Sequence, residues 1–484
     1  MKNTLFILLS LLVLASCKKD QLLTDADAKL DFSTDSVLFD TVFTQVGSTT
    51  KLFRIYNNHS QPMTISNIHL LQGSSSQFRL NVDGVSGTSI NNVEILGGDS
   101  LYAFVQVTVN PNQASPLLIV DQVVFETNGN TQSVYLTAIG RDVYLHKPDH
   151  FPTNGLPPYS IISCNATWTN DKPHLIFGFA VVDSGCTLTM MPGTQVYLHK
   201  NAVLWVYAYG SLQVLGDHAN NQEVTFEGDR LEPEYKEIPG QWGYIWLMNG
   251  SLNNKIDWAK IKNGAIGLKV GDNSQNYSRP SLNISNTIIK NQKAAAIYAL
   301  GAQIYGYNNV FANCGQFVAA LFGGSFRFEQ CTFANYWDSN PNNATGSATT
   351  AARATPAIQL TNYNIDYTGT TYVNPLDSAY FRNCIVTGDI ADELAIDSTT
   401  AVAANCHYFF QNCIIKTGLN VTNGAHYNTI SQNINPVFKD VGKNDYNLTP
   451  TSPINNGDPT LYIPLDLNTN FRDTPDIGAY EYIP

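Results

Sequence analysis

The chain has 484 residues, which is long enough for two or three domains and a large core. Its 43% hydrophobic content and only 14% charged residues exclude a disordered chain. A net charge of −12 and a pI of about 5.1 exclude a nucleic-acid binder that depends on a basic footprint. No apolar run of 18 residues follows the N-terminus, so the sequence does not predict a multispanning membrane protein.

The N-terminus has the pattern of an export signal. Lys2 provides a positive start, and residues 4–14 form an apolar segment of secretory length. The next residues, Leu14-Ala15-Ser16-Cys17, resemble the lipobox of bacterial, Bacteroidetes-type surface lipoproteins. That resemblance implies a signal peptide over 1–17, lipidation of Cys17, and a lipid anchor in the outer membrane, either inside the envelope or at the cell surface. The alternative is an ordinary signal peptide in which small residues precede a cysteine.

Residues 18–34 are polar and are interpreted as a tether, and a β-sandwich is predicted over 35–145. Short bursts of β-branched and aromatic residues alternate there with turn residues, which is typical of an immunoglobulin-like sandwich. The bursts are Ser36–Phe43, Lys51–Tyr56, Met63–Ile68, Leu101–Val109, Gln122–Glu126 and Ser133–Ile139. Tyr56–Asn58 before Pro62–Ile65, and Val107–Pro111, resemble Hydin-like and major-sperm-protein-like modules. The resemblance implies a spacer or docking module without a catalytic motif.

A proline-rich linker is predicted over 146–159, because four prolines in fourteen residues favour an extended, stiff segment. The remainder, 160–484, repeats. Similar octapeptides start 28, 22, 22, 53 and 29 residues apart: Ile256–Asn263, Ile284–Asn291, Gly306–Asn313, Phe328–Asn335, Phe381–Gly388 and Phe410–Thr417. This period and the short strands predict coils of a right-handed parallel β-helix. A leucine-rich repeat is disfavoured because regular leucines are absent. The gap of 53 holds either two coils or one coil with an insertion within 336–378.

The coil hypothesis assigns a role to each repeat position. The first position (Ile256, Ile284, Phe328, Phe381 and Phe410, with Gly306 as the exception) and the sixth (Ile261, Ile289, Phe311, Phe333, Val386 and Ile415) are expected to point inward. The third position, mostly asparagine, suits a left-handed bend. The fourth position contains Cys331, Cys384 and Cys413, which are interpreted as a buried stack of free thiols because no Cys-x-x-Cys spacing indicates metal or redox chemistry. Cys164 and Cys186 lie one coil apart and could face each other; their disulfide state is left open.

Two segments carry a resemblance to a known family. Gly185–Tyr197, Leu204–Gly216, Glu223–Phe226 and Pro239–Trp246 resemble the opening coils of pectate-lyase-like β-helix proteins of bacterial surfaces. Asp445–Asp458, Arg472 and Pro475–Tyr482 resemble the closing segment of secreted right-handed β-helix proteins. The resemblance implies the fold over 160–484, with a C-terminal cap, and says little about activity.

No catalytic constellation stands out in the sequence. A glycosidase needs two carboxyl groups about 5–9.5 Å apart, and a calcium-dependent lyase needs clustered carboxylates. The outward second position reads Asp257, Ser285, Tyr307, Glu329, Arg382 and Gln411, without an acid pair. Asp389, Asp392 and Glu393 are interpreted as a solvated loop, and Arg472, Asp473 and Asp476 as parts of the cap. We therefore predict no catalytic residue, no metal site and no cofactor, and the enzyme question stays open, leaning towards no.

Aromatic residues provide the main surface clue. Trp205, Tyr207 and Tyr209 alternate with Leu204, Val206 and Ala208, so the pattern predicts that they share one face of a strand. Tyr244 and Trp246 do the same further along, and Tyr363, Tyr367 and Tyr372 lie in the predicted insertion. The five residues Trp205, Tyr207, Tyr209, Tyr244 and Trp246 form a candidate glycan-binding strip. The alternative is that their rings pack under loops or against the sandwich.

Three functions remain open at this level. The first is a noncatalytic cell-envelope lipoprotein whose β-helix binds a polysaccharide or a surface protein. The second is a carbohydrate-active enzyme, either a polysaccharide lyase or a glycoside hydrolase. The third is a structural or adhesion spacer. They are ranked in this order.

Overall fold

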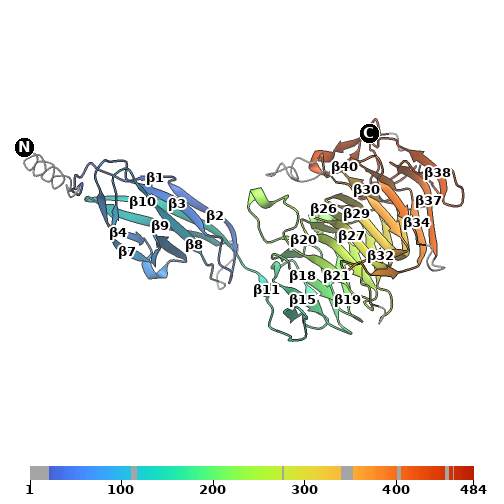
Figure 1. The fold of residues 1–484 in the computed structure, drawn as a ribbon, viewed down its shortest axis with the longest axis horizontal. Helices are drawn as coiled ribbons and strands as arrows, with labels where there is room; N and C mark the ends of the chain where they lie inside the picture. The colour runs from blue at the N-terminus through green and yellow to red at the C-terminus, as the bar shows by residue number, and fades with distance from the viewer. Residues whose placement is uncertain are drawn as a thin grey trace, which may run out of the picture. The chain divides into compact units, whose positions relative to one another are not determined.

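The computed structural model describes residues 21–110, 117–274, 277–339, 353–399, 405–452, 457–461 and 463–483. The predicted signal segment 1–17, with Cys17, lies outside these residues. The chain forms two compact units, Met1–Val143 and Tyr144–Pro484 (Figure 1). Among the described residues, no helix has the length and apolar character needed to cross a membrane.

The first unit is a β-sandwich of two five-stranded sheets, ordered β1-β3-β8-β5-β6 and β2-β10-β9-β4-β7. Its inner faces bury Phe53, Ile65 and Phe125, among others. The sandwich begins within the segment predicted as a tether, since Leu30 is buried in the core. Its elements are β1 (Asp31–Phe32), β2 (Ser36–Phe43), β3 (Lys51–Tyr56), β4 (Met63–Leu70), η1 (Gly73–Ser75), β5 (Phe78–Val82), β6 (Val85–Gly87), β7 (Ser89–Ile95), β8 (Ser100–Val107), β9 (Leu117–Thr127) and β10 (Asn130–Arg141).

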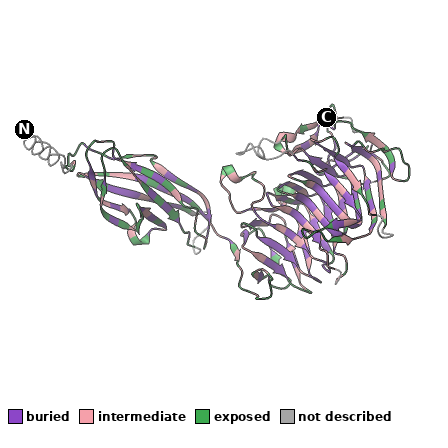
Figure 2. Cartoon of the chain, in the orientation of Figure 1, coloured by how far each residue is buried: buried purple, intermediate pink, exposed green. Residues whose placement is uncertain are grey.

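The second unit is a parallel β-helix, as predicted: 26 strands form one continuous sheet in which most strands pair in parallel with the equivalent strand of the next coil. In the early coils three strands make one turn, so that β15 pairs with β18 and β18 with β21. Figure 2 shows the buried interior running through the coils. The first half comprises β11 (Tyr144–His146), β12 (Tyr159–Ile161), β13 (Thr167–Trp168), β14 (His174–Ile176), β15 (Phe179–Val182), β16 (Thr187–Met190), β17 (Gln195–Leu198), β18 (Val203–Val206), β19 (Ser211–Leu215), η2 (Ala219–Asn221), β20 (Val224–Gly228), η3 (Pro233–Tyr235), β21 (Tyr244–Leu247), β22 (Asn254–Asp257), β23 (Ala259–Lys262), β24 (Ile266–Gly271), β25 (Ser281–Ser285) and β26 (Ile288–Gln292).

In the second half of the solenoid, two strands of each coil merge into one long strand in β27 and β29. The elements are β27 (Ala295–Tyr307), β28 (Val310–Cys314), β29 (Phe317–Glu329), β30 (Thr332–Asn335), β31 (Ile358–Thr361), β32 (Tyr363–Ile365), β33 (Thr371–Val373), β34 (Leu376–Arg382), β35 (Ile385–Gly388), β36 (Leu394–Asp397), β37 (Cys406–Ile415), β38 (Tyr427–Gln432), β39 (Phe438–Asp440), η4 (Val441–Lys443) and β40 (Asp445–Leu448). The segment predicted as a linker contributes to the solenoid at both ends, because His146 lies in β11 and Tyr159 in β12.

The predicted inward ladders are confirmed in register. Successive members of the first ladder are paired from Ile256 to Phe410, and those of the sixth position from Ile261 to Ile415. All their apolar side chains are buried. Gly306 is the exception because a Cβ there would lie 2.8 Å from the Phe328 ring. The aromatic ring thus occupies the space that a larger side chain would need.

The predicted asparagine bends are confirmed as left-handed turns. Asn286, Asn308, Gln330, Asn383 and Asn412 have φ between 49° and 52°. Asparagine and, less readily, glutamine adopt this region without a large steric cost. The bend therefore turns the chain between two strands at the same point of each coil.

The gap of 53 residues is a single coil with an insertion. Phe328 pairs directly with Phe381, so no full coil separates them. Strand β31 is the regular strand of this coil, since it pairs in parallel with β29 and with β36. The extra residues lie before and after β31 and include the β32–β33 hairpin, on which Tyr367 is fully exposed. The low-complexity residues 343–352 lie outside the described residues.

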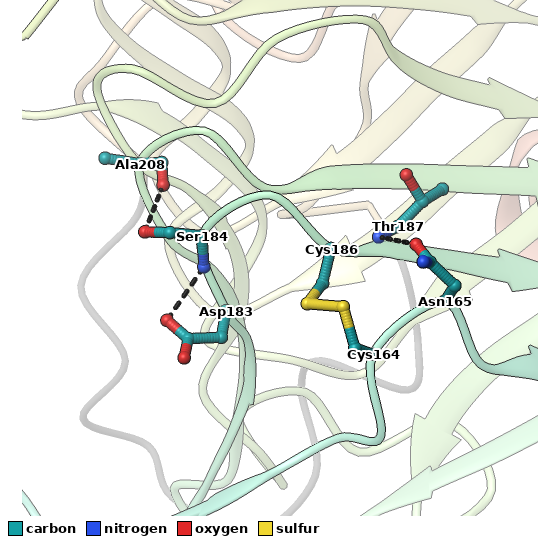
Figure 3. The surroundings of a disulfide bond; sticks show 7 residues. All are labelled: Cys164, Asn165, Asp183, Ser184, Cys186, Thr187 and Ala208. Atoms are coloured by element: carbon teal, nitrogen blue, oxygen red, sulfur yellow. Dashed lines mark hydrogen bonds between the residues drawn. A yellow bond between two sulfur atoms is a disulfide. The ribbon is translucent and has the colours of Figure 1, made fainter.

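The cysteines follow two different patterns. Cys331, Cys384 and Cys413 are free and buried, as predicted, and burial raises the pKa of the Cys384 thiol well above its ordinary value. Cys164 and Cys186 form a disulfide between adjacent coils, with their Cα atoms 4.9 Å apart. Figure 3 shows the bond beside a hydrogen bond of 3.1 Å from the Thr187 amide to the Asn165 side chain. The open disulfide question is therefore resolved in favour of the bond.

At the start of the β-helix, the side chains of His146, Trp168 and His174 form a stack of rings. The centroids of Trp168 and His174 are 3.8 Å apart, and His146 stacks on Trp168 at 4.8 Å. His146 Nε2 and His174 Nδ1 lie 3.0 Å apart. Burial lowers the pKa of His146 to about 4 and that of His174 to about 3, so both rings are neutral at physiological pH.

This stack predicts sensitivity to acid. Above pH 6.5 both rings are neutral whether the chain is folded or unfolded, so they add no pH dependence. Between pH 6.5 and about 4 the unfolded rings take up protons and the folded ones do not, so the free energy of unfolding falls, by up to about 3 kcal/mol for His146. His146→Phe keeps a ring in place and should flatten this slope in denaturant titrations across the range. An unchanged slope in His146→Phe, or an equal change in the exposed control His407→Gln, would contradict the assignment.

Candidate functional site

One outer surface of the solenoid gathers aromatic side chains. Strands β12, β15, β18 and β21 stack side by side, and residues at matching positions point outward in rows: Tyr159, Phe179, Val203 and Tyr244 form one row, and Ile161, Val181, Trp205 and Trp246 the next. We call these eight residues, together with Tyr207 and Met248, the aromatic face; all but Ile161 form one packed cluster. Coil stacking at about 4.8 Å brings equivalent rings into contact.

Trp205 and Trp246 form the centre of the aromatic face. Their rings are stacked, with centroids 4.9 Å apart and planes inclined by 8°. The next row member, Lys269, places its ammonium 4.3 Å from the Trp246 centroid. Burial lowers the pKa of Lys269, and the nearby Asp272 carboxylate opposes this shift. Trp205 is only 6% exposed, so these rings pack chiefly on one another, which corrects the expectation of an open strip.

The prediction that Trp205, Tyr207 and Tyr209 share one strand face is also wrong. Strand β18 ends at Val206, one residue before Tyr207. Tyr207 meets Trp205 edge-on at 5.4 Å, whereas Tyr209 lies in a turn with φ of 66° and is 63% exposed. Strict alternation fails because the chain turns here to begin the next side of the coil.

A cavity of about 150 Å³ opens at one end of the aromatic face. An apolar cavity of roughly this volume accepts one six-membered ring. Its walls are apolar or aromatic apart from one carboxylate, that of Asp183; the lining residues are Leu156, Tyr159, Ile161, Val181, Asp183, Trp205 and Tyr207. Figure 3 shows Asp183 accepting a hydrogen bond from the Ser184 amide through Oδ1 at 2.7 Å.

The cavity has two accessible kinds of polar group, the Asp183 carboxylate and the Tyr207 hydroxyl. The Nε1–H of Trp205 has no hydrogen-bond partner among the described residues, but it is buried away from the open space. Burial and a hydrogen bond with Tyr277 raise the pKa of the Tyr207 hydroxyl, whose oxygen can still accept a hydrogen bond. Ring walls, a hydroxyl group and a carboxylate acceptor can together hold a small ring that has both apolar and hydroxylated sides.

Two of the carboxylates considered in the sequence are engaged with other side chains of the protein. In the outward second column, Glu329 is covered by Arg327 and accepts a hydrogen bond from Tyr305. Glu393 was predicted to lie in a solvated loop. This prediction is wrong, because the Glu393 side chain is fully buried against Arg353. It is buried because the inserted segment folds back over the coil.

The C-terminal segment, which was predicted to close the end of the solenoid, packs along the side of its coils: Arg472 Nη2 donates to Asn308, and the Ala479 amide donates to Thr332 on the next coil. Arg472 and Asp476 are buried, and the Asp476 amide donates to Glu481 at 2.8 Å. Burial raises the pKa of Glu481 to about 7. Within the described ranges, no group of three or more histidine, cysteine, aspartate or glutamate side chains could hold a metal ion.

Sequence reasoning missed three members of the site. Leu156 lies in the proline-rich segment, which carries no strand pattern, and Asp183 follows a buried strand as a single turn residue. Lys269 belongs to the same outward row as Trp246. Of the three, only Lys269 could have been predicted from the sequence. The coil alignment that pairs Trp205 with Trp246 also pairs Trp246 with Lys269 on the next coil.

These features define the class of protein: a β-sandwich joined to a parallel β-helix that has an aromatic outer face. No family model matches the chain, and neither does any curated protein sequence. Among solved structures, the catalytic unit of a GH87 α-1,3-glucanase from Streptomyces thermodiastaticus is 10% identical, over 79% of this chain and 88% of that one, with a TM-score of 0.28.

Two further solved structures match a smaller part of the chain. A family 123 glycoside hydrolase from Clostridium perfringens is 7% identical over 23% of this chain, with a TM-score of 0.17. The periplasmic chaperone SfaE is 10% identical over 24%, with a TM-score of 0.18. The matches span 25% and 58% of those two proteins, respectively. At these scores the fold assignment rests on the strand register of this chain.

Proposed function

We propose that this protein is a noncatalytic cell-envelope lipoprotein that binds a glycan at the aromatic face of its β-helix. The observation that carries the proposal is the cavity of about 150 Å³, lined by Tyr159, Trp205, Tyr207 and Asp183. A pyranose ring presents C–H groups on its faces and hydroxyl groups around its edge. Aromatic walls suit the first, and a carboxylate with a phenol suits the second.

A binding role is favoured over hydrolysis because of the lining of this cavity. Asp183 is the one carboxylate among the lining residues. Glycoside hydrolysis by the usual mechanisms requires a second carboxyl group about 5–9.5 Å away. The carbohydrate-active enzyme remains the alternative function, and product formation on a polysaccharide distinguishes it from binding.

Attachment to the envelope is the second part of the proposal. A lipidated Cys17 would anchor the chain in the outer membrane, and the short polar segment before the sandwich would connect the anchor to the folded units. The lipoprotein class carries two kinds of acyl attachment, which satisfies the requirement for stable anchoring. Metabolic labelling with a fatty-acid analogue tests this, with Cys17→Ser as the unlabelled control.

The binding proposal predicts a strong effect of Tyr207→Ala. Losing the side chain removes one wall of the cavity and a hydroxyl group, so affinity for a retained polysaccharide should fall by about tenfold or more. Affinity electrophoresis in gels containing xylan, mannan or dextran measures the change, and Tyr367→Ala, which removes a fully exposed tyrosine of the insertion, is the matched control. Equal retention of Tyr207→Ala and Tyr367→Ala would contradict the assignment.

A further inference from the structure

A second outer surface of the β-helix carries a groove lined by lysine side chains. The groove has a volume of about 390 Å³, within the usual range for ligand sites. Its floor is formed by β20, β23 and β26, and Asn444, at the end of η4, lines it from the C-terminal segment; the lining residues are Thr225, Phe226, Glu227, Lys260, Ile261, Lys262, Ile288, Lys290 and Asn444. We call it the lysine groove.

Strand register concentrates the positive charge. Lys262 pairs directly with Lys290 on the next coil, and Lys260 pairs with Ile288. Three ammonium groups therefore line the groove, together with the single carboxylate of Glu227. The entire chain carries only 27 Lys and Arg against 39 Asp and Glu, so this concentration of lysine is unusual for its composition.

Each of the three lysines has one carboxylate partner, and the three ion pairs differ in how close they are. Lys262 Nζ lies 2.9 Å from Glu227, and Lys260 Nζ lies 2.8 Å from Glu223, which is outside the lining. Lys290 has the loosest contact, 3.8 Å from Glu237. Burial lowers the pKa of Lys290; the Glu237 carboxylate opposes this shift, and the nearby charges of Lys262, Lys236 and Lys260 add to it. An added anion between Lys262 and Lys290 would relieve this repulsion.

The groove also has an apolar and a neutral polar component. Ile288 lies on its floor and packs against the cluster formed by the C-terminal segment. Thr225 and Asn444 contribute a hydroxyl and an amide. This combination suits a ligand whose ring contacts Ile288, whose hydroxyl groups meet Thr225 and Asn444, and whose anionic substituent meets the lysines.

We propose that the lysine groove is a second binding site, separate from the aromatic face, for a sugar that carries a carboxylate or a sulfate group. The proposal goes beyond the function proposed above and does not depend on it, because the two sites lie on different strands of each coil. Carboxylate and sulfate oxygens both accept hydrogen bonds from ammonium groups.

The test compares dextran sulfate and polygalacturonate with neutral dextran, using the full chain in detergent. We expect both acidic polymers to bind and the binding to weaken at high salt, since exposed ion pairs are screened. The double variant Lys262→Gln/Lys290→Gln should bind them about tenfold more weakly. The control Lys29→Gln/Lys51→Gln removes the same charge from the sandwich and should bind normally.

Two further variants separate the possible outcomes. Lys262→Arg/Lys290→Arg keeps both charges and should retain binding, which guards against a folding defect in the glutamine variant. Tyr207→Ala should also retain binding of the acidic polymers, so failure at the aromatic face is distinguishable from failure here. Absence of binding, equal loss in the sandwich control, or binding to anionic phosphatidylglycerol vesicles in place of the polymers would overturn the proposal.

Discussion

Replacing Arg353 with methionine is expected to lower the free energy of unfolding of the β-helix by about 3–5 kcal/mol at neutral pH. Arg353 and Glu393 are both fully buried, and Nη2 and Nη1 of the arginine lie 2.6 and 3.0 Å from the two carboxylate oxygens. Without the arginine, Glu393 keeps hydrogen bonds from the Ala357 and Ile390 amides but loses its counter-charge. A single buried carboxylate without a cation is strongly unfavourable.

The pH dependence of this variant provides a second check. Burial already raises the pKa of Glu393, and removing Arg353 raises it further. An acid whose folded-state pKa is raised destabilises the protein above that pKa and stops doing so when it is protonated at lower pH. The loss in Arg353→Met should therefore shrink as the pH falls from 7 towards 5.

The surface pair of Arg279 and Asp377 provides the matched control. Both side chains are about one-third exposed or more, so Arg279→Met should cost no more than about 1 kcal/mol. Urea titrations followed by tryptophan fluorescence report on the β-helix alone, because all six tryptophans lie between residues 168 and 337. A cost below about 1 kcal/mol for Arg353→Met would contradict the role assigned to the buried pair.

Phe381→Ala is the second substitution with a large expected effect. The Phe381 ring lies 5.5 Å from that of Phe328 and 4.7 Å from that of Phe410, so it bridges the coil before it and the coil after it. In Phe381→Ala, the rings of Phe328 and Phe410 could fill the resulting cavity only if a whole coil moved. We expect a loss of about 3–5 kcal/mol in the free energy of unfolding.

Tyr380, the adjacent residue on the same strand, tests whether the stability loss in Phe381→Ala comes from the inward ladder. Tyr380 points outward and is 42% exposed, so Tyr380→Ala should cost less than about 1 kcal/mol. Phe381→Leu retains most of the buried volume and should lose less than Phe381→Ala. Similar losses for Phe381→Ala and Tyr380→Ala in the same urea titrations would contradict the ladder.

The repeat pattern predicted the interior well because stacking imposes one requirement on every coil. Any residue equivalent to Phe381 contacts its counterparts on the preceding and following coils. Each coil therefore needs an apolar side chain at this position, or a glycine where the ring of the next coil fills the space. The bends at Asn286 and Asn383 were predictable for the same reason, since the backbone must turn in the left-handed region at each repeat. Cys164 and Cys186 had the right spacing, but spacing alone does not give the direction of their side chains.

The surface was predicted less completely because it depends on segments outside the repeat. The position of Tyr209 was missed since strand β18 ends three residues earlier, and a strand end is a local event that alternation does not indicate. Glu393 was missed because its partner Arg353 lies forty residues away in the inserted segment. The lysine groove depends on Asn444 of the C-terminal segment, which returns to pack beside the coils.

The most direct test of the account is a polysaccharide panel in which retention and cleavage are measured on the same samples. The full chain is incubated with neutral and acidic polysaccharides, with and without calcium, and co-sedimentation, reducing ends and absorbance of unsaturated uronates are followed. We predict retention on at least one neutral polysaccharide, lost in Tyr207→Ala, without new reducing ends or double bonds. New reducing ends or double bonds would contradict the noncatalytic assignment, and the absence of retention on every polysaccharide would contradict glycan binding itself.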